Sequence, residues 1–236
     1  MKILAVDSSG LVASVAVVMD DVMLGEYTIN YKKTHSQTLL PMLRDLAEMI
    51  ELDLATVDAI ATAGGPGSFT GLRIGSATVK GLALALSLPV VSVPTVDALA
   101  FNLWGHQDVV CPLMDARRNQ TYTGLYRFAE GKMNVIKQQC AVDIETILSE
   151  INVMGEAVVF LGDGVPVFRD AIGERCKVPY SFAPAHVNKQ RAGAVASLAS
   201  LYYREGKVTK AEDHKPEYLR LSQAERERME KMDAGN

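Results

Sequence analysis

The sequence is poor in the residues that build metal centres and disulfide frameworks. Its 236 residues include only three cysteines, an odd number with no C-x-x-C pair, so they cannot form a closed set of disulfides. The four histidines lie far apart, and no two of them stand three or four residues from each other. These patterns disfavour a disulfide-stabilised secreted domain, a zinc site and a histidine-based nucleophilic centre.

Long apolar runs and a signal peptide are also missing. The longest stretch without charge, Gly81 to Val96, spans 16 residues and contains Pro89 and Pro94, so it is too short and too broken to cross a bilayer. At the N-terminus, Asp7 interrupts the apolar run too early for a signal peptide. We therefore expect a cytoplasmic protein with no membrane partner.

Basic charge is not in excess. The chain has 24 Lys and Arg against 28 Asp and Glu, which gives a net charge of −4. Residues 1–105 carry 6 basic and 10 acidic side chains and so hold the whole −4, yet they remain poor in charge for their length. Such a composition disfavours a protein that binds nucleic acid by itself. With 48% hydrophobic residues, the chain has ample material for a core.

The pattern of elements repeats once along the chain. In the first part it predicts strands over 2–7, 12–19, 22–30, 58–63 and 89–93, and helices over 36–52, 71–88 and 96–103. In the second part it predicts strands over 109–114, 120–128, 133–139 and 157–161, and helices over 143–151, 165–172 and 190–204. Each part opens with a strand that ends on an aspartate, Asp7 or Asp115. We expect a duplicated α/β fold of two β-β-β-α-β-α units, with domains 1–105 and 106–236.

The turn Asp7-Ser8-Ser9-Gly10 offers the groups that can hold a phosphate and a metal ion. The same residues can equally serve only to close a hairpin turn. The matching turn of the second part, Asp115-Ala116-Arg117, has no glycine to allow close approach of a phosphate. Asp7, Ser8 and Ser9 are therefore candidates for a vestigial phosphate site, and no productive cofactor is expected.

The loop Gly64-Gly65-Pro66-Gly67-Ser68-Phe69-Thr70-Gly71 is the most unusual stretch of the sequence. It fits neither the dinucleotide fingerprint, nor the P-loop, nor the G-x-S-x-G nucleophile elbow. A tight structural loop and a ligand cradle both remain open at this point.

Two predicted helices are unusually apolar. Helix 71–88 has only two charges, Arg73 and Lys80, and helix 36–52 has an apolar stripe wider than one contact with a sheet requires. Burial by the rest of the chain would explain this, but we favour a partner surface. The candidate interface residues are Leu39, Leu40, Leu43, Leu46, Ile50, Leu72, Arg73, Gly75, Val79 and Leu82.

Several motifs together resemble the bacterial TsaB (YeaZ) family. They are the segments 3–9, His35-Ser36 with Leu39-Leu40-Pro41, 65–75, Lys80-Gly81-Leu82-Ala83, Asp115-Ala116-Arg117-Arg118 and Pro216-Glu217-Tyr218-Leu219-Arg220. The resemblance covers nearly the whole chain, and segment 65–75 is its most specific part.

The resemblance implies the duplicated RNase H-like fold of the actin, Hsp70 and sugar-kinase superfamily. It further implies a non-catalytic subunit that pairs with the paralogue TsaD, the subunit that transfers a threonylcarbamoyl group to an adenosine beside the tRNA anticodon. The ATPase TsaE would act with them, so ATP would be used by the complex and tRNA met only through it. Without TsaD, a homodimer through the same helices is expected.

One departure from the catalytic paralogue supports this interpretation. The stretch that corresponds to its metal-binding histidine pair is Val96 to Phe101, which contains no histidine. Three alternatives remain: a small-molecule kinase or ATPase of the same superfamily, a glycoprotease-like metallopeptidase, and an interaction module with an unrelated partner.

Overall fold

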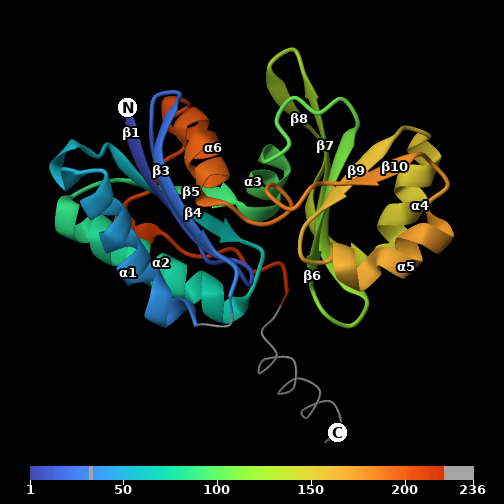
Figure 1. Ribbon diagram of the computed structural model, residues 1–236, viewed down its shortest axis with the longest axis horizontal. Coiled ribbons are helices and arrows are strands. Elements are labelled where there is room, and N and C mark those ends of the chain that lie inside the picture. Colours follow the sequence, from blue (N-terminus) through green and yellow to red (C-terminus); the bar gives the residue numbers. More distant parts are fainter. Residues whose placement is uncertain (32–33, 221–236) are drawn as a thin grey trace, which may run out of the picture.

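Two five-stranded sheets of identical topology form the protein (Figure 1). The computed structural model describes residues 1–31 and 34–220, so most of the charged tail lies outside the description. The sheets have the orders β3-β2-β1-β4-β5 and β8-β7-β6-β9-β10, which correspond position by position. The duplication predicted from the sequence is confirmed.

The first sheet and its helices extend from the N-terminus to α3. The strands are β1 (Lys2–Asp7), β2 (Ala13–Met19), β3 (Val22–Ile29), β4 (Ala59–Gly65) and β5 (Val90–Pro94). The helices are α1 (His35–Met49), α2 (Phe69–Leu86) and α3 (Thr95–Phe101), with a short 3₁₀ turn η1 (Leu54–Thr56) before β4.

The second sheet follows with the same order of elements. Its strands are β6 (Val109–Asp115), β7 (Gln120–Ala129), β8 (Lys132–Asp143), β9 (Val158–Leu161) and β10 (Tyr180–Phe182). Its helices are α4 (Ile144–Met154) and α5 (Val165–Arg175), and the chain continues into α6 (Ala192–Arg204) and the 3₁₀ turn η2 (Ala211–Asp213).

Most differences from the predicted elements have a local cause. Helix α2 begins two residues earlier than predicted, because Ser68 precedes it and its side-chain oxygen accepts a hydrogen bond from the amide of Gly71. Strand β8 continues to Asp143 along its partner β7. The prediction missed β10, which has only three residues and pairs in parallel with β9.

The two faces of the first sheet have different cores. On β1, Leu4 and Val6 point to the side of α1 and α2, while Ile3 and Ala5 point to α6. Small side chains on both α6 and this face, such as Ala196 and Ala61, allow close packing. Helix α6 follows the second sheet in sequence but packs on the first (Figure 1). The division into domains 1–105 and 106–236 stays a prediction. The chain does return to the first sheet, through α6, after it has completed the second sheet.

A buried carboxylate connects the two parts of the molecule. Asp97 on α3 accepts a hydrogen bond from the hydroxyl of Tyr126 on β7 at 2.6 Å and another from Tyr202 on α6 at 3.4 Å. Burial raises the pKa of Asp97, and these two hydrogen bonds oppose that shift. The network therefore joins α3, the second sheet and α6 at one point.

Replacing Tyr126 by phenylalanine tests this connection. The Tyr126→Phe variant removes a short hydrogen bond to a buried carboxyl group, so we expect the free energy of unfolding to fall by about 1.5–3 kcal/mol. Chemical denaturation measures the change. Tyr203→Phe is the matched control, because the hydroxyl of Tyr203 makes no hydrogen bond within residues 1–31 and 34–220. Equal losses for both variants would contradict the role assigned to Tyr126.

Candidate functional site

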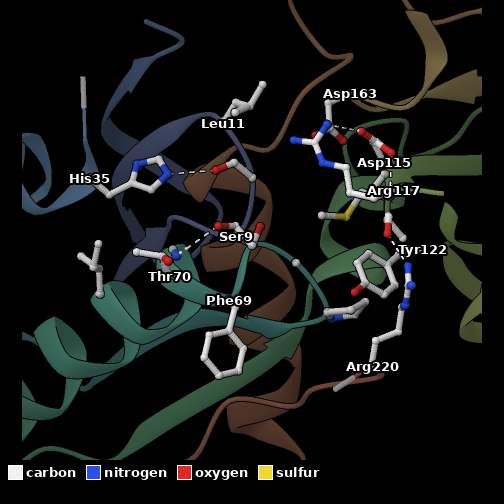
Figure 2. A pocket seen from close by; sticks show the side chains of 18 of the residues that line it. Ser9, Leu11, His35, Phe69, Thr70, Asp115, Arg117, Tyr122, Asp163 and Arg220 are labelled. Carbon is white, nitrogen blue, oxygen red and sulfur yellow. Dashed lines mark hydrogen bonds and ion pairs between the residues drawn. The ribbon is translucent and has the colours of Figure 1, made fainter. Parts of the chain in front are cut away.

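A cleft of about 970 Å³ separates the two parts of the molecule. One wall carries the turn after β1, the start of α1 and the loop before α2, while the opposite wall carries the end of β6 and the loop after β9. Residues 218–220 near the C-terminus also line the cleft. Figure 2 shows His35, Ser9 and Phe69 on one side of the cleft and Asp115, Arg117 and Asp163 on the other.

The candidate phosphate turn directs its polar groups into the protein. Asp7 is buried, and its Oδ1 accepts hydrogen bonds from the amide and the hydroxyl of Ser9 at 2.9 and 2.6 Å. The hydroxyl of Ser8 donates to the carbonyl oxygen of Gly71 at 2.9 Å. Burial raises the pKa of Asp7 to about 6, against the hydrogen bonds from Ser9, which lower it. The side chains predicted to hold a phosphate are thus already paired with each other and with α2.

The glycine-rich loop packs directly on this turn. The amide of Ser68 donates to the carbonyl oxygen of Ser9 at 2.7 Å. A Cβ atom at Gly67 would overlap that same oxygen, and one at Gly71 would overlap the carbonyl oxygen of Ser8. The glycines therefore permit close approach of the protein's own backbone, which favours the structural explanation of the loop.

His35, the first residue of α1, also supports the turn. Its Nε2 lies 2.9 Å from the carbonyl oxygen of Gly10, and because a carbonyl only accepts, Nε2 carries the proton.

The second wall has a different chemistry. Asp115 accepts a hydrogen bond from the amide of Arg117 at 2.8 Å and pairs with its guanidinium group at 3.0 Å. Arg117, Arg118 and Asn119 all adopt left-handed backbone conformations, with φ of 65°, 53° and 61°. A self-paired turn of bulky residues thus stands where the first part has Ser8 and Ser9.

Asp163 was missed by the sequence analysis. It follows β9 in the segment Gly162-Asp163-Gly164, which packs against the backbone of Leu113 as the first glycine-rich loop packs against Ser9. Burial raises the pKa of Asp163, and its Oδ1 has no partner within the part of the chain described. The two glycines that flank this aspartate after a strand were the signal that could have found it.

These residues do not fit a nucleotide phosphate with its metal ion. The hydroxyls of Ser8 and Ser9 and the amide of Ser9 are committed to protein acceptors, and the Arg117 turn carries no glycine. Asp7 lies beneath the surface and its Oδ1 already accepts two hydrogen bonds from Ser9, whereas a hard cation requires an accessible oxygen. Within residues 1–31 and 34–220, no three or more His, Cys, Asp or Glu side chains are grouped so as to hold a metal ion.

The candidate interface residues divide into two sets. Half of them are buried in the chain itself beneath α1 and α2: Leu39, Leu43, Leu46, Leu72 and Val79. Gly75 is also buried and lies against the hydroxyl of Ser8. Packing on the sheet accounts for the apolar character of these six positions, and a role for them at an interface stays a prediction.

The remaining candidates are accessible. Ile50 and Leu82 are half-buried, while Leu40 and Arg73 are exposed. Arg73 stacks over the ring of Phe69 at 4.0 Å. A partner surface on these helices is thus restricted to their outer faces, and it stays a prediction.

Comparisons with known proteins agree with this architecture. The family described as "TsaD: tRNA N6-adenosine threonylcarbamoyltransferase" matches residues 23–228. The tRNA threonylcarbamoyladenosine biosynthesis protein TsaB of Bacillus subtilis is 30% identical over 95% of this chain and 96% of its own length. The TsaB of Escherichia coli is 29% identical over 93% of this chain and 95% of its own length.

Solved structures show the same relationship. The structure of YeaZ from Pseudomonas aeruginosa has a TM-score of 0.79 and 30% identity, covering 92% of this chain and 99% of that one. The ADPNP-bound activator of the 2-hydroxyisocaproyl-CoA dehydratase from Clostridium difficile has a TM-score of 0.50 over 88% of this chain and 97% of its own. At 11% identity, the second likeness shows the fold alone.

The duplicated sheets and the cleft between them define an α/β protein with the duplicated RNase H-like fold shared by actin, Hsp70 and the sugar kinases. Identity across nearly the full length of both chains then narrows this class. The chain belongs to the TsaB (YeaZ) family. No helix within the described residues is both long and apolar enough to cross a membrane.

The raised pKa of Asp7 predicts a pH-dependent effect of the Asp7→Asn variant. Between pH 3.8 and about 6 the folded state keeps a proton that the unfolded state loses, so ionisation of Asp7 destabilises the fold as pH rises. Asparagine stays neutral and retains the acceptor oxygen for Ser9. We expect its free energy of unfolding to match the wild type near pH 4 and to exceed it by up to roughly 3 kcal/mol above pH 7.

Urea denaturation between pH 4 and 8 measures this difference. Asp21→Asn, at an exposed turn, controls for the loss of one negative charge. A difference between Asp7→Asn and the wild type that does not change with pH would contradict the assignment.

Proposed function

We propose that this protein is a non-catalytic subunit in the biosynthesis of threonylcarbamoyladenosine in tRNA, acting in the cytoplasm by pairing with TsaD and recruiting the ATPase TsaE. It contributes a docking surface and no reacting group. ATP is consumed by the complex, and tRNA is contacted only through the complex. The names of the relatives that match over nearly the full length support a part in this biosynthesis. The surface of α1 and α2 supports the role of a docking subunit.

The single observation that carries this proposal is the apolar character of the outer surface of α1 and α2. These helices lie side by side on one face of the first sheet (Figure 1). Leu40 is 55% exposed, Met49 84% and Leu84 56%. We define the α1–α2 face by seven exposed residues of the two helices: Leu40, Pro41, Met49, Ala77, Gly81, Leu84 and Ala85. On α1 the exposed pair Arg44 and Glu48 stands between Leu40 and Met49. Exposed apolar groups of this kind favour a surface that a partner covers.

Gly81 gives this face a second unusual property. It lies in the interior of α2, where glycine costs about 1 kcal/mol relative to alanine. A Cβ atom there would meet nothing within 4 Å, so the chain itself gives no reason for the glycine. Exposed Ala77 and Ala85 lie on the same side of the helix, one turn before and after it. Small side chains in this arrangement allow a partner helix to approach the α2 backbone closely.

The charges of α2 do not oppose such docking. Lys80 turns away from the face and donates to the carbonyl oxygens of Glu212 and His214 at 3.0 and 3.2 Å. Arg73 is held over Phe69. The central part of the face therefore presents no free charge from α2. The equivalent helices of TsaD, or of a second copy when TsaD is absent, would pack here, so the two assemblies would compete for one surface.

The alternative of a small-molecule kinase or ATPase rests on the cleft and on the fold. Two observations weigh against it: the donors of Ser8 and Ser9 are taken up by the protein, and Asp115 is paired with Arg117. Calorimetry with ATP and Mg²⁺ on the isolated chain distinguishes the two functions, since tight binding would favour the kinase.

A charge introduced on the α1–α2 face tests the proposal directly. In Leu84→Glu, a carboxylate replaces an exposed leucine that association would bury, so we expect affinity for TsaD and for a second copy to fall roughly 100-fold. The free energy of unfolding of the monomer should change little, because Leu84 is outside the core. Titration calorimetry and analytical ultracentrifugation measure the two associations.

Val153→Glu provides the matched control on α4 of the second part, where Val153 is 86% exposed. It introduces the same charge at an exposed apolar position away from the proposed face. Undiminished association of Leu84→Glu with both partners, or an equal loss for Val153→Glu, would show that the assigned surface is wrong.

A further inference from the structure

The motif Pro216-Glu217-Tyr218-Leu219-Arg220 has no role in the proposed docking surface. The chain reaches it from α6 by passing along the outside of the first sheet, where Thr209 pairs with Val90 on β5. Lys80 of α2 then holds the carbonyl oxygens of Glu212 and His214. In Figure 1 this red segment runs from the first sheet toward β6. It is therefore anchored on the first part before it reaches the cleft.

The motif itself continues this anchoring at the glycine-rich loop. The amide of Glu217 donates to the carbonyl oxygen of Gly64 at 2.7 Å. Gly65 has φ of 118° and lies so close to Glu217 that a Cβ atom would overlap its carbonyl oxygen. The ring of Tyr218 packs on Phe69 with centroids 4.7 Å apart. A backbone pair, a close approach and a ring contact thus fix the motif to the first wall.

Two other side chains of the same motif reach the second part. The guanidinium group of Arg220 donates to the carbonyl oxygen of Ala116, in the turn after β6. The carboxylate of Glu217 accepts a hydrogen bond from Gln139 of β8 at 3.0 Å. Within five residues, the chain therefore holds the first part at Gly64 and Phe69 and the second part at Ala116 and Gln139.

We infer that residues 216–220 are a clasp that sets the width of the cleft by tying its two walls together. Asp97 joins the two parts at α3 through Tyr126, and the clasp joins them again at the cleft. Two separate attachments restrict a hinge motion that either alone would permit. Without the contacts to Ala116 and Gln139, the second part is no longer tied to the clasp. The clasp keeps its contacts to Gly64 and Phe69 in the first part.

A distance measurement across the cleft tests the clasp. Spin labels at Gln37 on α1 and Asp170 on α5, both exposed, report the separation of the two parts. They are introduced in a Cys140→Ser, Cys176→Ser background, and Cys111 is buried. In the double variant Glu217→Ala, Arg220→Ala, we expect the distance distribution in the full chain to shift to longer values and to broaden.

Lys215→Ala is the matched control, since this exposed residue of the same segment makes no hydrogen bond or ion pair in the described structure. It should leave the distribution unchanged. Tyr218→Ala should broaden it, whereas Tyr218→Phe, which keeps the ring on Phe69, should not. Circular dichroism shows whether each variant is folded. If the double variant does not fold, Arg220→Ala alone is tested, and its distance distribution is again expected to lengthen and broaden. A folded clasp variant with the wild-type distribution would overturn the inference.

Discussion

The contact between the turn after β1 and the loop before α2 determines much of the rest of the structure. Ser68 donates its amide to the carbonyl oxygen of Ser9, and Gly67 and Gly71 come so close to this turn that no side chain fits. This contact fixes the start of α2 and therefore which side of the helix faces the sheet. Beside this contact, the hydroxyl of Ser8 donates to the carbonyl oxygen of Gly71 and the hydroxyl of Ser9 donates to Asp7, so donors that a phosphate would need are already taken. The packing of this turn on α2 thus bears on both the outer face of α2 and the chemistry of the cleft.

As a consequence, the inner and outer sides of α1 and α2 have different roles. Their inner sides supply Leu39, Leu43 and Val79 to the core of the first sheet. Their outer sides carry apolar groups that this core does not need, together with an interior glycine at position 81. The proposed pairing with TsaD uses only the outer sides, so the fold and the docking surface place separate demands on the same helices.

The sequence predicted the duplicated topology because strand and helix periodicities repeat in the same order and each unit opens with a strand ending in aspartate. It could not separate the two sides of α1 and α2, since core leucines and surface leucines look alike until the sheet fixes the helix rotation. Asp163 and the clasp were missed for a related reason. Several of their contacts, those to Leu113, Ala116 and Gly64, are made to backbone groups far away in the sequence, which have no side-chain signature.

In the proposed function, a catalytic partner requires this chain, which contributes no reacting group of its own. The test is reconstitution of threonylcarbamoyladenosine formation on tRNA with purified TsaD and TsaE, supplied with threonylcarbamoyl-adenylate and ATP, with and without this chain. We expect modification only when the chain is present, and undiminished modification with a folded Asp7→Asn variant. Full modification without the chain, or its loss with a folded Asp7→Asn variant that still binds TsaD, would rule out the proposed function.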